Sequence, residues 1–198
     1  MESEESKTNE EIKSGPKSEN TFRSFIVEVV KIVVIAAVIV VPIRFFLFQP
    51  FFVNGESMNP NFDDGDYLII DEISYRFSAP QRGDVIVFKY PEDPVNRFIK
   101  RIVGLPGETV RVSEGEVTIV SGDRIMNLDE EYLPEDISTS GSLEVALGDD
   151  QYFVLGDNRP YSFDSRRFGP LLKKYITGKV FFRAWPLESA SIIKQPSY

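Results

Sequence analysis

The first fifty residues change from a polar stretch to a strongly apolar one. Residues 1–22 are polar and low in complexity, with six Glu and three Lys, and they predict a disordered tail. Residues 32–43 are apolar and uncharged, and the apolar pattern continues past Arg44 to residue 48. Seventeen helical residues span about 25 Å, close to the thickness of a bilayer core. The pattern therefore predicts a membrane anchor over residues 23–48.

Two other interpretations of this apolar segment fit less well. A buried core helix normally has a polar face, and residues 32–41 show none. A cleaved signal peptide should be followed by a small-residue cleavage site, whereas the chain continues with large aromatic residues. The acidic tail makes the charge balance across the segment weak, so charge alone leaves the orientation of an anchor open.

Beyond residue 49 the pattern changes to short strands separated by turn residues. Strands are predicted at residues 67–73, 84–90, 97–103, 110–112, 116–120, 151–155 and 179–184. Residues 113–115 are typical of a hairpin turn. Because no helical pattern alternates with these strands, we expect a mainly β domain over residues 49–198, built as a barrel or a folded sheet. The acidic stretch 123–148 has little pattern and is expected to be an excursion on the surface.

The composition narrows the possible functions. The 198 residues carry a formal net charge of -9, which disfavours nucleic acid as a partner. The chain has no Cys and no His, so it cannot build a Ser-His-Asp triad, a thiolate nucleophile or a His-ligated metal site. If the protein is a hydrolase, its general base has to be a Lys, Asp, Glu or Tyr side chain.

Ser57 lies in an irregular segment directly after the apolar stretch. Gly55 frees the backbone before it, and Pro60 prevents a regular element after it. A serine in such a turn can expose its hydroxyl and direct its own backbone N–H into the same space. This is the arrangement of nucleophile and oxyanion donor that acyl transfer needs. The alternative is an ordinary turn serine.

Lys100 lies in a predicted strand, where Phe98 and Ile102 share its face. Burial between such side chains disfavours the ammonium form and lowers the pKa of a lysine. A lysine that is neutral near pH 7 can take a proton from a serine. Arg101 cannot act in this way, because a guanidinium does not lose its proton in proteins. The alternative is a solvated lysine on an edge strand.

A third segment, residues 156–169, is dense in hydrogen-bonding groups. Ser162 can hold the lysine amine, and Asp164 and Arg166 are close enough in sequence to form an ion pair that stiffens the loop. A capped surface loop is one alternative. A metal site is another, since Asp157, Asn158 and Asp164 offer oxygen ligands, although they lack the spacing of a calcium loop.

Taken in this order, these elements resemble the type I signal peptidases between about residues 45 and 186. The matching motifs are residues 46–51 at the membrane exit, 55–60 around the nucleophile, 82–88 before the base, 100–108 around the base and 156–169 in the last loop. On this match Ser57 is the catalytic serine and Lys100 the catalytic lysine. Ser162 would orient the lysine, with Asp164 and Arg166 in support.

The resemblance implies a membrane-anchored β catalytic domain outside the cytoplasm, a single-pass anchor in the cytoplasmic membrane and a cytoplasmic tail. The partners would be the lipid bilayer and exported pre-proteins, which are cut after small residues; no cofactor and no metal is implied. The chain departs from the family at Gly55, where some members carry a serine whose hydroxyl helps the oxyanion hole. It also carries Pro160 and Tyr161 where small residues are usual.

Two rival functions remain from the sequence. A self-cleaving repressor-type peptidase would share the Ser/Lys pair, but such proteins are soluble and carry a DNA-binding head, which the apolar segment argues against. A membrane-tethered β binding module would need no catalysis and should tolerate the loss of an exposed Lys100.

Overall fold

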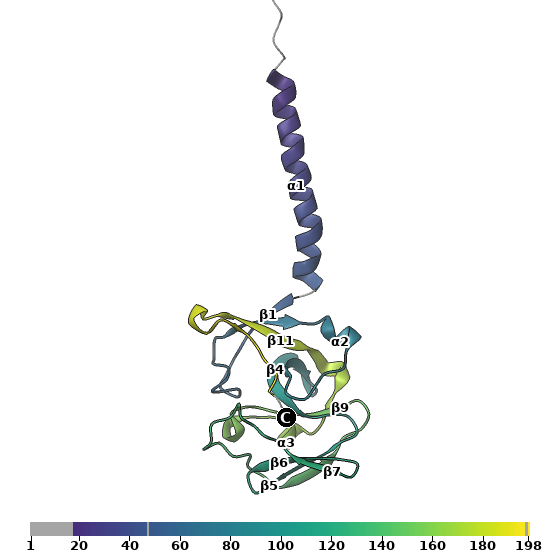
Figure 1. Ribbon diagram of the computed structural model, residues 1–198, viewed down its shortest axis with the longest axis vertical. Helices are drawn as coiled ribbons and strands as arrows, with labels where there is room; N and C mark the ends of the chain where they lie inside the picture. The colour runs from purple at the N-terminus through teal and green to yellow at the C-terminus, as the bar shows by residue number, and fades with distance from the viewer. Residues whose placement is uncertain (1–17, 47, 197) are drawn as a thin grey trace, which may run out of the picture. The chain divides into compact units, whose positions relative to one another are not determined.

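The computed structural model describes residues 18–46, 48–196 and 198. They divide into two compact units, one as far as Pro42 and one from Ile43 to Tyr198. Helix α1 (Ser18–Phe46) accounts for the described part of the first unit and ends within the second, to which every described strand belongs (Figure 1). Most of the tail predicted over residues 1–22 lies outside the described residues, and the helix begins within its last part, at Ser18.

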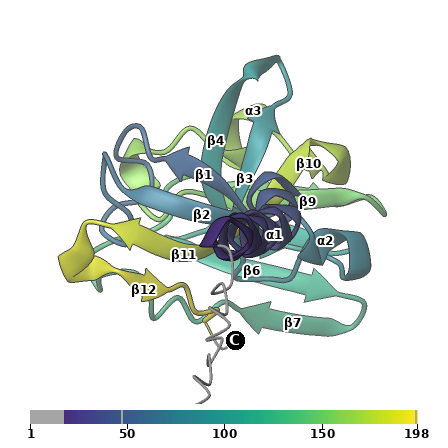
Figure 2. The same cartoon turned by 90° about the horizontal axis from the view of Figure 1, so that it is seen from above.

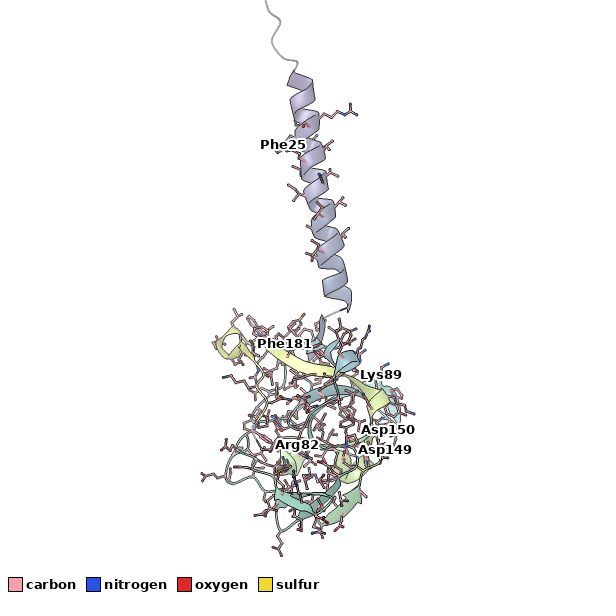
Figure 3. All side chains as sticks on the ribbon, turned by 45° about the vertical axis from the view of Figure 1, so that its right-hand side comes forward. Phe25, Arg82, Lys89, Asp149, Asp150 and Phe181 are labelled. Atoms are coloured by element: carbon pink, nitrogen blue, oxygen red, sulfur yellow. The ribbon has the colours of Figure 1, made fainter. Side chains whose placement is uncertain are left out.

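Helix α1 covers most of the apolar segment in which an anchor was predicted. Its described side chains, residues 22–40, are all exposed and point outward in several directions, as Phe25 does in Figure 3. Glu28 and Lys31 interrupt the apolar surface. Among the described residues, no helix is both long enough and apolar enough to cross a membrane.

The second unit is built from two antiparallel sheets, as the mainly β prediction requires. In the described part of the chain, the larger sheet has eight strands in the order β1-β2-β11-β3-β4-β9-β10, with β12 added to β11. These strands are β1 (Phe48–Phe52), β2 (Tyr67–Asp71), β3 (Val85–Tyr90), β4 (Asp93–Gly104), β9 (Gln151–Leu155), β10 (Leu171–Leu172), β11 (Ile176–Trp185) and β12 (Ser191–Ile192). Because the order runs from β1 to β10 without closing, the result is a folded sheet and not a closed barrel.

The smaller sheet has four described strands in the order β7-β6-β5-β8 and lies at the far end of this unit from β1 and β11 (Figure 1). Its strands are β5 (Thr109–Ser113), β6 (Glu116–Ser121), β7 (Arg124–Asn127) and β8 (Leu143–Ala146). The hairpin predicted around residues 113–115 is confirmed, with Gly115 in the left-handed region at φ 90°. Within the stretch 123–148, which we expected to be an excursion on the surface, β7 and β8 pair with β6 and β5.

Short helices connect the strands. The described ones are the α-helices α2 (Ser74–Phe77) and α3 (Ser165–Phe168) and the 3-10 helices η1 (Arg159–Tyr161), η2 (Lys173–Tyr175) and η3 (Leu187–Ser189). The helix α3 begins directly after Asp164, whose side chain accepts a hydrogen bond from the Arg166 backbone N–H. This capping bond fixes the last part of the 156–169 loop.

Strand β4 is the strand on which the interior of the domain is organised. It lies between β3 and β9, and its residues Ile99, Ile102 and Val103 belong to three different clusters of buried apolar side chains. The end of β4 at the hairpin with β3 is exposed and extends beyond the neighbouring strands (Figure 2). The second half of β4 is therefore enclosed by neighbouring strands and packed side chains, and Lys100 lies in this half.

Candidate active site

Lys100 is buried in the middle of β4. It pairs with Ile86 of β3, and only 3% of its surface is exposed. The amine lies 5.7 Å from the centre of the Phe98 ring. Burial lowers the pKa of Lys100 to about 8, while the carboxylates of Asp164 and Asp157 act in the opposite direction. The solvated edge-strand lysine is thus the wrong interpretation, since β4 is central and its lysine is enclosed.

Ser57 lies in the loop between β1 and β2. Two buried side chains that follow it, Met58 and Phe62, anchor this loop in the core. Gly55, at φ 90°, turns the chain before Ser57 and donates its N–H to the Asp64 carboxylate at 2.7 Å. Such a φ is accessible to glycine at little cost, so Gly55 allows the turn that presents the serine.

The structure brings Ser57 and Lys100 together. The Lys100 Nζ donates to the Ser57 Oγ at 2.7 Å and to the Ile99 carbonyl oxygen at 2.7 Å. The backbone N–H of Ser57 has no hydrogen-bond partner in the described part of the chain. A hydroxyl, an amine of lowered pKa and an unused N–H therefore meet at one place.

The turn after β9 holds the Ser57 loop from the other side. The Asn158 backbone N–H donates to the Ser57 carbonyl oxygen at 3.1 Å, and its side-chain amide donates to the Glu56 carbonyl oxygen at 2.9 Å. Gly156 lies so close that a Cβ there would overlap both the Ser57 carbonyl oxygen and the Ser162 side chain. The spacing between β9 and the Ser57 loop thus depends on the absence of a side chain at residue 156.

Ser162 is buried near this turn, and 6% of it is exposed. Its hydroxyl makes no well-formed hydrogen bond among the described residues, but it lies near enough to Asp164 to help lower the pKa of that carboxyl. The lysine amine is bonded to Ser57 and Ile99 instead, so the orienting role that we expect of Ser162 stays a prediction.

Asp164 and Arg166 form the ion pair that their spacing suggested. Their side chains make two contacts, at 2.9 Å and 2.8 Å, and Asp164 also accepts the Gly156 N–H at 3.1 Å. Burial acts to raise the pKa of Asp164, but the hydrogen bonds and charge of Arg166 outweigh it and hold the pKa below its ordinary value. The pair therefore connects the end of β9 to α3.

Sequence reasoning missed the ion pair behind the lysine. Arg101 points away from Ser57 and makes two hydrogen bonds to Asp157, at 2.9 Å and 2.6 Å, with both side chains buried. Asp157 had been considered as a metal ligand; it also accepts from the Asn61 amide at 2.9 Å. The sequence held one indirect signal: Arg101 directly follows Lys100, and Asp157 directly follows Gly156. Because β4 and β9 are neighbouring strands, the two charged residues come to lie side by side.

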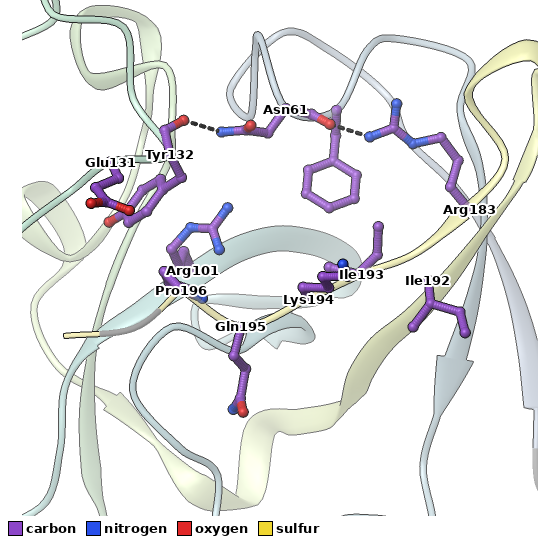
Figure 4. A pocket seen from close by; sticks show the side chains of 11 residues that line it. Asn61, Arg101, Glu131, Tyr132, Arg183, Ile192, Ile193, Lys194, Gln195 and Pro196 are labelled. Atoms are coloured by element: carbon purple, nitrogen blue, oxygen red, sulfur yellow. Dashed lines mark hydrogen bonds between the residues drawn. The ribbon is translucent and has the colours of Figure 1, made fainter.

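Two pockets lie on the two sides of β4. One, of about 410 Å³, contains Ser57 and Lys100 and is walled by Phe51, Phe52 and the β3–β4 hairpin residues 95–99. The other, of about 430 Å³, is shown in Figure 4 and is lined by Arg101, Tyr132 and part of the C-terminal segment. Of these two pockets, only the first is lined by both Ser57 and Lys100.

Comparisons with known proteins show which family this chain is similar to. The family described as "Signal peptidase, peptidase S26" matches residues 26–185. A Synechocystis protein named "Probable signal peptidase I-2" is 39% identical over 88% of this chain and 78% of its own length. Signal peptidase I V of Bacillus subtilis is 36% identical over 74% of this chain and 92% of its own length. A solved structure of a signal peptidase I from Enterococcus faecalis overlaps with 52% of this chain and 97% of its own, at 31% identity and a TM-score of 0.45.

Proposed function

The chain belongs to the signal peptidases of the peptidase S26 family, and on this premise we propose that it removes N-terminal signal peptides from exported pre-proteins, with Ser57 as nucleophile and Lys100 as general base. The observation that carries the proposal is the 2.7 Å contact between the Lys100 amine and the Ser57 hydroxyl. Cleavage would follow small residues at the first and third positions before the scissile bond.

The proton transfer follows from the burial of Lys100. In its neutral form the amine keeps an N–H on the Ile99 carbonyl oxygen and turns its lone pair to Ser57, 2.7 Å away. As the Ser57 Oγ attacks the scissile carbonyl carbon, its proton moves to Nζ. The resulting ammonium then gives this proton to the leaving amine, and Lys100 is neutral again for the second half of the reaction.

The negative charge of the tetrahedral intermediate needs hydrogen-bond donors. We assign the Ser57 backbone N–H to this task, because it is unpaired among the described residues and belongs to the nucleophile itself. Gly55 supplies no side-chain donor. Collapse of the intermediate leaves an acyl group on Ser57, and a water molecule activated by Lys100 releases it.

Ser162, Asp164 and Arg166 would support this pair. Ser162 has a buried hydroxyl that helps to lower the pKa of Asp164, and in this proposal it turns to the lysine once the amine is protonated. Asp164, held by Arg166, bonds the Gly156 N–H and raises the pKa of Lys100 against the effect of burial. In this proposal the ion pair keeps the lysine from becoming too weak a base.

Membrane attachment is also part of the proposal. The apolar side chains of α1 are exposed throughout residues 22–40, and an apolar surface of this kind needs lipid or a partner to cover it. We propose that residues 23–48 anchor the enzyme and that the domain from residue 49 works outside the cytoplasm. Protease added to intact cells should then digest the domain and leave the tail, and the reverse pattern would argue against a role in processing exported proteins.

Cleavage of a model pre-protein tests the proposed function. Detergent-solubilised protein should release the signal peptide at one bond, identified by mass spectrometry. Ser57→Ala and Lys100→Ala should each lower the rate by at least about 10²–10⁴-fold while circular dichroism stays unchanged, and the double variant should be no worse because the pair acts as a unit. Substantial turnover by folded Lys100→Ala protein would sink the Ser/Lys assignment.

A further inference from the structure

We propose that the segment from Glu130 to Ser140 is a positioning element of the active site, and that Glu130 is a positioning residue that acts through Arg159. This inference rests on the proposed roles of Ser57 and Lys100. It concerns a part of the chain that carries no motif and that the sequence pattern assigns to the surface. This segment contacts the turn after β9 and the loop that follows Ser57, and the distance between Ser57 and Lys100 depends on both.

One buried guanidinium connects this segment to the turn after β9. The Arg159 side chain has no exposed surface, and its two terminal nitrogens donate to the Glu130 carboxylate at 2.8 Å and 2.5 Å. The same group donates to the Thr139 hydroxyl and, at 3.2 Å, to the Tyr132 hydroxyl. Burial acts to lower the pKa of Arg159, but Glu130 outweighs it and holds the pKa above its ordinary value. The buried charge is therefore compensated by residues of this segment.

From Arg159 the contacts continue to Ser57. The Arg159 Nε donates to the Gly156 carbonyl oxygen at 3.0 Å. Two residues further on, the Asn158 backbone N–H donates to the Ser57 carbonyl oxygen at 3.1 Å. Arg166, the partner of Asp164, adds a bond to the Arg159 carbonyl oxygen at 2.6 Å. A continuous path thus leads from the Glu130 carboxylate to the backbone of the nucleophile.

A second, independent connection reaches the nucleophile loop through Asn61. Its amide donates to the Tyr132 carbonyl oxygen at 2.8 Å, as Figure 4 shows, and to Asp157 at 2.9 Å. The Tyr132 ring lies against the Arg101 guanidinium, 4.0 Å from its centre. The segment therefore contacts the loop that follows Ser57 and the residue that follows Lys100.

These contacts predict which kinetic constant depends on Glu130. None of the segment's residues lines the pocket that holds Ser57 and Lys100, so substrate binding should change little. Without Glu130 the buried Arg159 loses its charge partner, and the turn that it holds can shift. A displacement of Ser57 by about 1 Å is enough to cost about 10²-fold in rate, because the chemical step requires aligned groups.

The test compares Glu130→Gln with a matched variant, Glu144→Gln, in a peptide-cleavage assay on the full chain. Glu144 lies shortly after this segment, on β8, and its ion pair with Arg111 is exposed. We expect kcat to fall about 10–100-fold in Glu130→Gln with KM nearly unchanged, and no change in Glu144→Gln. Wild-type kcat in folded Glu130→Gln protein would overturn the proposal.

A loss of stability has to be separated from a loss of positioning. Val117→Ala creates a cavity in the core of the smaller sheet and is the control for reduced stability. Assayed below its melting temperature, it should keep its kcat; if it loses kcat as much as Glu130→Gln, the positioning role is wrong. Should Glu130→Gln not fold, Asn61→Ser decides, since it removes the second connection from a half-buried site and should also lower kcat.

Ser57→Ala in the same assay keeps this inference distinct from the proposed function. If Ser57→Ala still cleaves, the proposed function fails and the positioning role fails with it. If Ser57→Ala is inactive while Glu130→Gln and Asn61→Ser turn over like the wild type, the proposed function stands and only the positioning role is lost.

Discussion

At the residue scale, the protonation of Lys100 should decide when the enzyme works. Burial lowers the pKa of its amine to about 8, so the neutral form is a minority below that pH and the majority above it. Only the neutral form has a lone pair for the Ser57 proton, and the acylation rate should therefore rise with pH and level off above about pH 8. Single-turnover rates with a peptide ester or amide across this range provide the measurement.

Lys100→Arg is the control for this pH dependence. A guanidinium keeps its proton at every accessible pH, so the variant should be inactive throughout, although it conserves the charge. A rate that stays constant from acid to alkaline pH in the wild type would mean that another group takes the proton.

The individual residues also mark where sequence reasoning stops. Ser57 and Lys100 could be named as candidates because each carries a local chemical signal, a glycine-flanked turn and an apolar strand face, and because the order of the motifs resembles a known family. Contacts between distant positions carry no such signal. Arg101 and Asp157 are 56 residues apart, Asn61 and Asp157 are 96 apart, and Glu130 and Arg159 are 29 apart. Only the folded sheet brings these pairs together.

At the scale of elements, the turn after β9 should tolerate no side chain at residue 156. A Cβ there would overlap the Ser57 carbonyl oxygen and Ser162, so Gly156→Ala has to push the two loops apart. We expect the free energy of unfolding to fall by about 1–3 kcal/mol and kcat by about 10–100-fold. Denaturant titration and peptide cleavage measure the two effects.

Gly148→Ala is the matched control, because neither glycine has a positive φ and the two substitutions differ only in the space around them. At residue 148 the added Cβ would meet the end of the half-buried Gln151 side chain at 3.3 Å; this amide oxygen accepts the Gly148 N–H at 2.8 Å and has to shift by only a few tenths of an ångström. Stability and kcat should both stay near the wild-type values. Equal losses in the two variants would show that the tight approach at Gly156 is unimportant.

Strands with one buried face could be predicted from the sequence. Strands without a buried face were missed. The prediction for residues 151–155 agrees with β9, and the predictions for β3, β5 and β6 err by one or two residues. Strands β7 and β8 were missed because nearly all of their side chains are at least partly exposed, so no apolar alternation marks them. No strand was predicted over β1, because its Phe-rich sequence continues the apolar stretch; Phe48 was assigned to the end of the anchor and the next residues to the membrane exit.

At the scale of the whole molecule, the division into two units predicts that they can be separated. The second unit starts at Ile43 and contains both sheets, so a protein lacking residues 1–42 keeps β1 and its pairing with β2. It should melt at the temperature of the full chain and cleave a short soluble peptide with the same kcat/KM. Cleavage of a pre-protein inserted in lipid vesicles should fall by about tenfold or more, because enzyme and substrate no longer share a membrane.

The comparison of the two substrates is the readout that matters in this experiment. A truncated protein that unfolds would show that residues before Ile43 belong to the folded domain. A truncated protein that cleaves the vesicle-bound pre-protein as fast as the full chain would show that α1 does not concentrate the enzyme at its substrate, and would remove the reason for an anchor.

Successive side chains of β4 point to opposite faces of the sheet, and this alternation restricts how the strand can change in length. Lys100 and Arg101 are adjacent and face the two different pockets, and the pairing of Lys100 with Ile86 determines which of them meets Ser57. Deleting one residue between the hairpin and Lys100 would reverse every side chain of the strand and present a guanidinium to the serine. The domain could still form its sheet, but it would lack a base. If Lys100 is the base, we therefore expect related chains to keep the number of residues between the hairpin and the lysine, and to gain or lose residues at the exposed tip of the hairpin.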